Sequence, residues 1–250
     1  MSAGRSDWTI LHVADRSFGA VLFDLDGVLT PTADVHMAAW RRMFTDFFTA
    51  HDIGPEYTDD DYFAHVDGRP RYEGVQECLA SRGVELPYGT PDDAPGDTTI
   101  CALGNSKNDA FNAVLREDGV EPYPGSVALL DLLQELGVPM AVVSSSRNAP
   151  DVLKVAGLAD RFEVVVDGKV AAAKGLPGKP APDTYQYAAR LLGVEDSVSV
   201  VVEDAISGVQ AGAAGDFALV IGVDRGAGAD DLVRAGAEVV VSDLAELVQR

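Results

Sequence analysis

The chain has 250 residues, of which 47% are hydrophobic and 7% aromatic, so it can bury a sizeable core. Acidic residues number 40 against 19 basic ones, and the resulting net charge of −21 argues against nucleic-acid binding, which requires a positive surface. With two cysteines and no apolar stretch of membrane-spanning length, the composition predicts a cytoplasmic protein without a disulfide framework that does not enter a membrane.

The first predicted element is a buried strand that ends in two carboxylates. Residues 20–23 (AVLF) are continuously apolar, as expected of a strand buried on both faces. Asp24 and Asp26 follow, and Gly27 permits a turn. Open α/β sheets bind ligands at this end of a strand, and two close carboxylates repel unless they share a cation or a proton. The pattern predicts a divalent metal site with one oxygen free to act as nucleophile, and a solvated surface turn is the alternative.

The region from residue 33 to residue 116 predicts helices, with one loop rich in proline and glycine at residues 86–97. The helical patterns cover residues 34–50, 59–66, 72–82 and 99–116. His36 and Trp40 lie one turn apart, so both packing against neighbouring helices and a role in a site are compatible with them. Arg71 precedes a helix, where it is either a solvated charge or an anion-binding side chain.

From residue 122 onward, helices alternate with short apolar strands. The predicted strands are residues 139–143, 163–166, 198–202, 218–222 and 238–241, and the helices between them are residues 126–136, 148–156, 182–192, 205–214 and 230–235, with a last helix after the final strand. This alternation predicts an α/β fold with a doubly wound, mostly parallel sheet. We therefore expect a catalytic core of residues 18–32 and 117–250, an inserted α-helical cap of residues 33–116 and an N-terminal extension of residues 1–17.

Three further strand ends carry polar side chains. A hydroxyl-rich turn, Ser144-Ser145-Ser146-Arg147-Asn148, follows one strand, where it could bind a phosphate or simply cap a helix. Lys179 lies in a proline-bracketed loop, where it could neutralise a carboxylate and a phosphoryl oxygen together. Glu203 and Asp204 follow the next strand and offer the oxygen ligands that Mg²⁺ prefers.

In order, placement and residue type, these four segments resemble the four motifs of the haloacid dehalogenase superfamily, and the cap inserted after the first motif resembles its β-phosphoglucomutase branch. The resemblance implies a Rossmann-like core in which Asp24 is the nucleophile and forms an aspartyl-phosphate, and Asp26 is the general acid/base. It implies that Ser144 and Lys179 bind the transferring phosphate. The implied Mg²⁺ ligands are Asp24, Asp26, Glu203 and Asp204, with Asp26 contributing its backbone carbonyl.

The resemblance also implies a substrate, a small-molecule sugar phosphate, and a set of residues that bind it. Arg71 matches an arginine on the non-transferring phosphate, and the full set is His36, Trp40, Arg71, Lys107, Ser145, Ser146, Arg147 and Asn148. The implied activity is interconversion of β-glucose 1-phosphate and glucose 6-phosphate through a bisphosphate, and a Mg²⁺-dependent sugar-phosphate phosphatase is the alternative. A silent binding module is disfavoured by the two aspartates, and a receiver-like domain by the cap. We expect a monomer.

Overall fold

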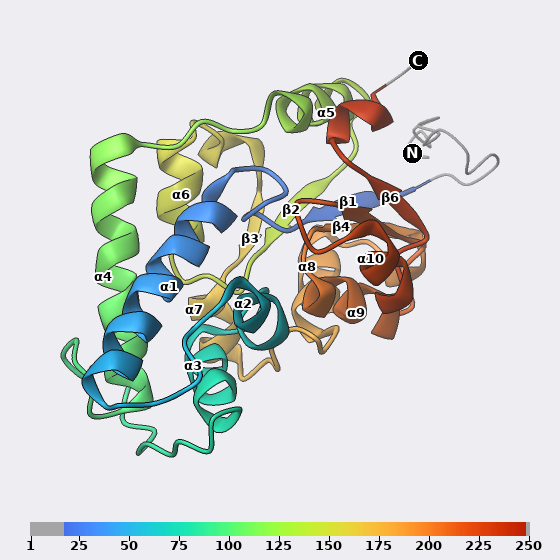
Figure 1. The fold of residues 1–250 in the computed structure, drawn as a ribbon. Helices are drawn as coiled ribbons and strands as arrows, with labels where there is room; N and C mark the ends of the chain where they lie inside the picture. Colours follow the sequence, from blue (N-terminus) through green and yellow to red (C-terminus); the bar gives the residue numbers. More distant parts are fainter. Residues whose placement is uncertain (1–17, 249–250) are drawn as a thin grey trace.

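A computed structural model describes residues 18–248, so the expected extension of residues 1–17 lies outside the described residues. The described chain forms a six-stranded sheet in which every neighbouring pair is parallel, in the order β3-β2-β1-β4-β5-β6 (Figure 1). The strands are β1 (Ala20–Phe23), β2 (Met140–Val143), β3 (Val164–Val166), β4 (Ser199–Glu203), β5 (Leu219–Val223) and β6 (Val239–Val241). The predicted α/β class and parallel sheet are confirmed.

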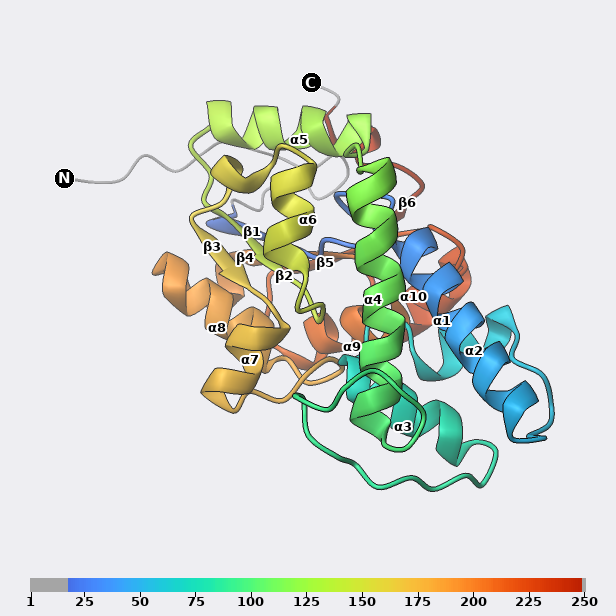
Figure 2. The same ribbon diagram turned by 90° about the vertical axis from the view of Figure 1, so that its left-hand side faces the viewer.

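Helices cover both faces of the sheet because successive strand residues point to opposite sides. Val21 and Phe23 pack in the same hydrophobic cluster as α5 (Pro124–Glu135) and α6 (Ala149–Val155). Leu22 packs in a second cluster, on the face covered by the helices α8 (Asp183–Leu192), α9 (Ile206–Ala214) and α10 (Ala229–Ala235). Figure 2 shows α5 and α8 on opposite sides of the strands. This double winding leaves the carboxyl ends of the strands open to receive a site.

Four helices between β1 and α5 lie beside the sheet, and we call them the cap. They are α1 (Thr32–Ala50), α2 (Asp59–His65), α3 (Arg71–Ala80) and α4 (Ile100–Asp118). Their shared core is largely aromatic and contains Trp40, Phe44, Phe47, Phe48, Tyr57 and Tyr62. The far half of α4 is different, because Phe111 and Leu115 pack in the cluster of the sheet. One helix therefore belongs to both hydrophobic cores and runs past residue 116, the expected limit of the cap.

Two elements differ from the sequence expectation. Helix α7 (Gly168–Lys174) was not predicted; the Asp167 side chain caps it by accepting the backbone N–H groups of Lys169 and Val170, and Gly175 ends it in the left-handed conformation. The expected last helix is a 3₁₀ turn, η3 (Leu244–Leu247), and two further 3₁₀ turns are η1 (Ala159–Arg161) and η2 (Asp196–Val198). The remaining predicted elements are present, with each end at the predicted residue or shifted by at most two.

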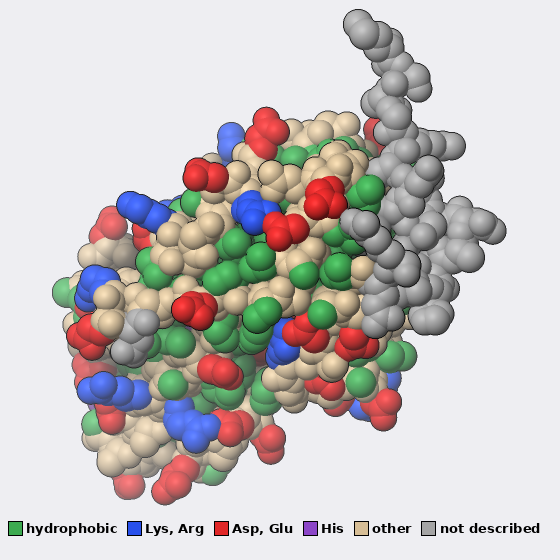
Figure 3. Space-filling model, turned by 90° about the horizontal axis from the view of Figure 1, so that it is seen from above, with side chains coloured by type: hydrophobic (Ala, Val, Ile, Leu, Met, Phe, Trp, Pro, Cys, Tyr) green, Lys and Arg blue, Asp and Glu red, His purple; other side chains and the backbone are tan. Residues whose placement is uncertain are grey.

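The surface seen from above carries acidic and basic side chains interspersed among hydrophobic ones (Figure 3). No continuous positive area gathers on the part of this face that the structure describes. Among the described helices, none is both long and apolar enough to cross a membrane.

Candidate active site

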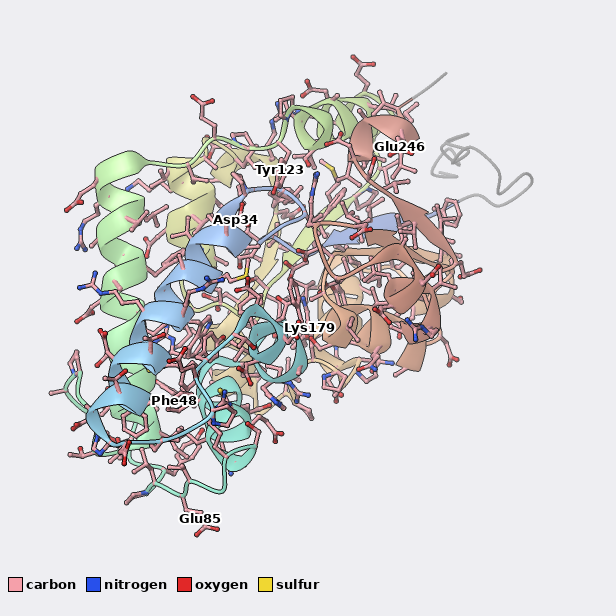
Figure 4. All side chains as sticks on the ribbon, in the orientation of Figure 1. Asp34, Phe48, Glu85, Tyr123, Lys179 and Glu246 are labelled. Atoms are coloured by element: carbon pink, nitrogen blue, oxygen red, sulfur yellow. The ribbon has the colours of Figure 1, made fainter. Side chains whose placement is uncertain are left out.

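The site forms where the carboxyl ends of three neighbouring strands meet beneath the cap. In the sheet, Phe23 pairs with Val142 of β2 and with Val202 of β4. The residues that follow these positions therefore converge, and they include Asp24, Ser144, Glu203 and Asp204. Lys179 reaches the same place from the loop before α8, and Figure 4 shows it between the cap and the sheet. The strand order thus gathers residues that are far apart in the chain.

Lys179 connects Asp24, the nucleophile candidate after β1, to Glu203 at the end of the neighbouring strand β4. Its Nζ atom lies 2.5 Å from Asp24 Oδ1 and 2.5 Å from Glu203 Oε1, and it donates to the carbonyl of Val143 at 3.0 Å. The side chain is 1% exposed. Burial disfavours its charge, but Asp24 and Glu203 outweigh burial and raise the pKa of Lys179 above its ordinary value. The lysine is therefore a permanent cation in this site.

Glu203 is held by hydrogen bonds on both carboxylate oxygens. Besides Lys179, the hydroxyl of Tyr185 donates to Oε1 at 3.1 Å. The backbone N–H groups of Asp204 and Ala205 donate to Oε2, both at 3.0 Å. Glu203 can therefore enter a metal's coordination sphere by giving up one of these bonds.

Three buried carboxylates form a cluster with oxygens within 4.8 Å of one another, from Asp24, Glu203 and Asp204. Among the described residues, no hydrogen-bond donor reaches the carboxylate of Asp204. Burial, and then the charges of Asp67 and Glu203, raise the pKa of Asp204 well above its ordinary value. Lys179 neutralises part of this charge. Hard oxygen ligands with excess negative charge are the donor set that suits a Mg²⁺-sized cation.

Gly27 makes this approach possible. Its φ angle is +85°, which favours glycine, and a Cβ atom there would lie 1.8 Å from Asp204 Oδ2. A side chain at this position would push Asp204 out of the cluster. The glycine noted in the sequence as a turn residue therefore also has a packing role.

Asp26 lies beside the nucleophile candidate and faces the cap. The hydroxyl of Thr32 donates to Oδ1, and Ser144 Oγ donates to Oδ2 at 3.4 Å. The Nε2 atom of His36 lies 3.4 Å from Oδ1. Burial works against ionisation, but His36 and the Thr32 hydrogen bond outweigh it and lower the pKa of Asp26 to about 2. The resting carboxylate is therefore ionised and able to accept a proton.

His36 and Lys107 meet at the cap side of the site. Lys107 is 3% exposed, and its ammonium contacts Nδ1 of His36. It lies 5.0 Å from the Trp40 ring centroid and 5.1 Å from that of Phe111, on which His36 stacks at 4.0 Å. Burial, followed by the charge of Arg71, lowers the pKa of Lys107 well below its ordinary value. Trp40 lines the cavity and also packs in the cap core.

Arg71, which lines the cavity, shares one acceptor with Asn148. Arg71 Nη2 donates to Asn108 Oδ1 at 2.6 Å, and Asn148 Nδ2 donates to the same oxygen at 2.7 Å. A second nitrogen of Arg71 donates to Asn105 Oδ1 at 3.4 Å. Burial lowers the pKa of Arg71, and the nearby guanidinium of Arg147 lowers it further. Among the described residues, neither arginine forms a salt bridge, so positive charge is concentrated here.

The serine-rich turn divides between local and long-range contacts. Ser145 Oγ donates to the backbone carbonyl of Gly68 in the cap at 2.7 Å. Ser146 Oγ accepts the backbone N–H of Asn148 at 3.2 Å. Arg147 donates to the Tyr72 hydroxyl at 3.4 Å, while its Nε is buried with no hydrogen-bond partner among the described residues. The turn therefore joins the cap to the core as well as facing the cavity.

The cavity brings together nearly all of the predicted residues. Its walls include Asp24, Asp26, His36, Trp40, Arg71, Lys107, Ser144, Ser145, Ser146, Arg147, Glu203 and Asp204. Lys179 and Asn148 do not line it directly but contact Asp24 and Ser146, which do.

Four side chains near the site were not predicted. Thr32 and Tyr185 donate to Asp26 and Glu203, and Tyr62 and Asp67 line the cavity from the cap. Burial raises the pKa of Asp67 to about 7; a hydrogen bond from Tyr62 opposes this shift and Glu203 adds to it. Of these four side chains, only Asp67 had a signal in the sequence that could have indicated its place near the site, because it lies in the loop that also carries Arg71.

The fold and the site define a class of protein. The model of the haloacid dehalogenase-like hydrolases matches residues 18–216, and the chain belongs to this family, in its β-phosphoglucomutase-like branch. It is 46% identical over 239 residues to a β-phosphoglucomutase of Mycobacterium bovis, covering 92% of this chain and 91% of the relative. It is 32% identical over 232 residues to a β-phosphoglucomutase of Bacillus subtilis, covering 91% and 94%.

Solved structures share the fold. A β-phosphoglucomutase from Clostridium difficile superimposes with a TM-score of 0.72 at 24% identity, covering 92% of this chain and 93% of the other. A hydrolase from Pseudomonas syringae gives a TM-score of 0.75 at 22% identity, covering 92% and 96%.

Proposed function

We propose that this protein is a Mg²⁺-dependent mutase that interconverts β-D-glucose 1-phosphate and glucose 6-phosphate through an aspartyl-phosphate and a bisphosphate. One observation supports this most directly: the cavity that contains Asp24 is also lined by two guanidinium groups without a salt bridge among the described residues, Arg71 and Arg147. Lys179 contacts Asp24 from outside the lining, so the nucleophile candidate has a cation of its own. A sugar carrying two phosphates needs charge neutralisation at both of its ends.

In this proposal Asp24 attacks the phosphorus of the near phosphate, while Lys179 neutralises a phosphoryl oxygen and Ser144 donates a hydrogen bond. Asp26, ionised at rest, takes the proton of the sugar hydroxyl that attacks the aspartyl-phosphate, and gives it to the leaving oxygen when Asp24 takes the other phosphate of the bisphosphate. The cap excludes water, so that the incoming group is a sugar hydroxyl.

The metal is part of the proposal. Asp24, Asp204, the backbone carbonyl of Asp26 and, after releasing a hydrogen bond, Glu203 would hold Mg²⁺. When bound, the ion neutralises charge on the transferring phosphoryl group. The fit is supported by the mutual approach of the carboxylates within 4.8 Å and by the unpaired carboxylate of Asp204 among the described residues.

The second candidate is a sugar-phosphate phosphatase, in which water replaces the sugar hydroxyl. One observation favours it: Arg71 and Asn148 already have an acceptor in Asn108, so these two donors are paired without a second phosphate. The test is product analysis with β-glucose 1-phosphate, Mg²⁺ and a catalytic amount of glucose 1,6-bisphosphate. Glucose 6-phosphate as the main product supports the mutase, and faster release of inorganic phosphate would establish the phosphatase instead.

A further inference from the structure

Asn108 occupies an unusual position, because one oxygen of this cap residue receives hydrogen bonds from two different parts of the protein. Arg71 at the start of α3 donates to it at 2.6 Å, and Asn148 from the core donates at 2.7 Å. Asn148 is 7% exposed, so its amide has little access to water. Two donors that converge on one oxygen reproduce the arrangement that binds an oxygen of a phosphate group.

The surroundings of Asn108 favour an anion over an amide. Arg147 lies close enough to affect the pKa of Arg71, and its buried Nε has no hydrogen-bond partner among the described residues. A neutral amide oxygen gives neither guanidinium group a salt-bridge partner, and Asp109 acts on Arg71 only as a nearby charge. A phosphate oxygen in the same place would accept the same hydrogen bonds and add negative charge, which would make the Asn148 bond charge-assisted and strengthen the Arg71 bond.

We propose that Asn108 Oδ1 takes the place of a phosphate oxygen while this end of the cavity is empty, and that a phosphate group displaces it on binding. This inference rests on the proposed function, because it concerns the site for the non-transferring phosphate. Asn108 is then a positioning residue, which holds Arg71 and Asn148 in their binding orientation and keeps the cap in contact with the core. It competes with the substrate instead of binding it.

A reaction through a bisphosphate intermediate would benefit from this role of Asn108. Between the two half-reactions the sugar has to turn so that its other phosphate faces Asp24, and the far site is vacated during that turn. A resident acceptor of similar geometry keeps the two donors paired in that interval, which avoids leaving buried donors unsatisfied.

The test measures the affinity for a bisphosphate and the unfolding temperature. Loss of a purely structural residue would change these two quantities in the same direction. Binding of glucose 1,6-bisphosphate is measured by calorimetry in an Asp24→Asn background, in which no phosphoryl transfer occurs, and thermal unfolding is measured without ligand. We expect Asn108→Ala to bind the bisphosphate about 3–10-fold more tightly, since no protein oxygen has to be displaced. Its unfolding temperature should fall by about 2–4 °C, since the bridge between cap and core is lost.

Asn108→Asp provides the opposite change and keeps the test decisive if the alanine variant folds poorly. A carboxylate that accepts from Arg71 and Asn148 should raise the unfolding temperature and weaken bisphosphate binding by about tenfold or more. Asn112→Ala is the matched control, because Asn112 lies one turn further along α4 and its side chain makes no hydrogen bond with the described residues; both quantities should stay unchanged.

Two results separate the possible failures. The displacement inference is wrong if the background protein binds the bisphosphate but Asn108→Ala weakens that binding tenfold. It is also wrong if Asn108→Asp changes affinity and stability in the same direction. Asn108 is then a ligand or a structural residue. If the folded background protein shows no affinity for the bisphosphate, the proposed mutase function itself fails, and the inference with it.

Discussion

The ammonium of Lys179 lies 2.5 Å from Asp24 Oδ1, although 155 residues separate the two in the chain. Replacing Lys179 with Met should leave Asp24 and Glu203 buried without their cation. Breaking a buried ion pair by removing one partner costs about 3–5 kcal/mol, so urea denaturation should show a loss of this order. Adding Glu203→Gln should recover part of the stability, because it removes one of the carboxylates left without a counter-ion. A single variant as stable as the wild type would contradict the contact.

Asp24 and Asp26 should differ in what their amide variants retain. Asp24→Asn should abolish turnover while the protein still folds, because the nucleophile is lost with little change of volume. Asp26→Asn should still form a phosphoenzyme but turn over about 10²–10⁴-fold more slowly, the usual contribution of general acid/base catalysis. Trapping the phosphoenzyme by rapid quench distinguishes the two. A loss below tenfold in Asp26→Asn would assign that role to another residue.

Asp204 should affect stability in opposite directions with and without Mg²⁺. In the absence of metal, Asp204→Asn should raise the unfolding temperature, because it removes one charge from a repelling cluster. With Mg²⁺ at ~100 times the dissociation constant, the wild type should gain about 2.7 kcal/mol, and the variant should lose most of this gain. Asp160→Asn, at an exposed site outside the cluster, is the control. Calorimetry that finds equal Mg²⁺ affinity in Asp204→Asn and wild type would refute Asp204 as a ligand.

Arg71 should separate isomerisation from hydrolysis. Arg71→Ala should slow isomerisation of β-glucose 1-phosphate by roughly 30–1000-fold, corresponding to ~2–4 kcal/mol for removing a charged partner from a desolvated contact. Hydrolysis of a small monophosphate, which has no second phosphate, should hardly change. Steady-state assays of both reactions on the same preparation provide the measurement. Equal losses in both would mean that Arg71 supports the fold.

The cap has its own pH-sensitive pair in Asp61 and Arg82. Arg82 Nη2 lies 2.8 Å from Asp61 Oδ2, and Thr58 N–H also donates to this oxygen at 2.8 Å. Burial works against ionisation of Asp61, but these hydrogen bonds outweigh it and lower its pKa. A carboxyl whose pKa is lower in the folded state stabilises the protein above its unfolded pKa of ~3.9, and this stabilisation is lost as pH falls through the folded value.

Asp61→Asn should therefore cost about 1–2 kcal/mol at pH 7, and the difference from wild type should shrink on acidification below pH ~4. Asp59→Asn is a matched control on the same helix, because its partner Arg41 is 52% exposed and an exposed ion pair contributes ~0–1 kcal/mol. Urea denaturation across this pH range tests both variants. A constant difference at all pH values would contradict the role of ionised Asp61.

The strands were predictable from the sequence because each is an apolar run bounded by glycine or polar residues. Once the strands were placed, the grouping of the residues at their ends was predictable too, because parallel strands place their carboxyl ends together. Helix α7 was missed because seven residues span two turns and Val170 is the sole large apolar side chain among them. Asp167 and Gly175 were nevertheless readable as its cap signals.

Partners of the site residues were harder to predict. Tyr185 reaches Glu203 because α8 packs on β1, β2 and β3, and the sequence does not specify which strands a helix covers. The predicted helix begins at residue 34, whereas α1 begins at Thr32, whose hydroxyl donates to Asp26. Asn108, in the middle of α4, meets Arg71 and Asn148 only through tertiary packing of the cap against the core.

The strand order also constrains how the chain is made. Strand β1 is near the N-terminus, yet its neighbours begin at Met140 and Ser199. At a synthesis rate of ~5–20 residues per second, the ribosome needs roughly 10–35 s to deliver the second neighbour. Until β2 has been made, the apolar AVLF segment has no native partner, while the cap helices, whose contacts are local, can already form. The nascent chain therefore carries a fully unpaired hydrophobic strand until it reaches Met140, and a strand with one open edge until it reaches Ser199, which makes β1 a segment that chaperones have reason to protect.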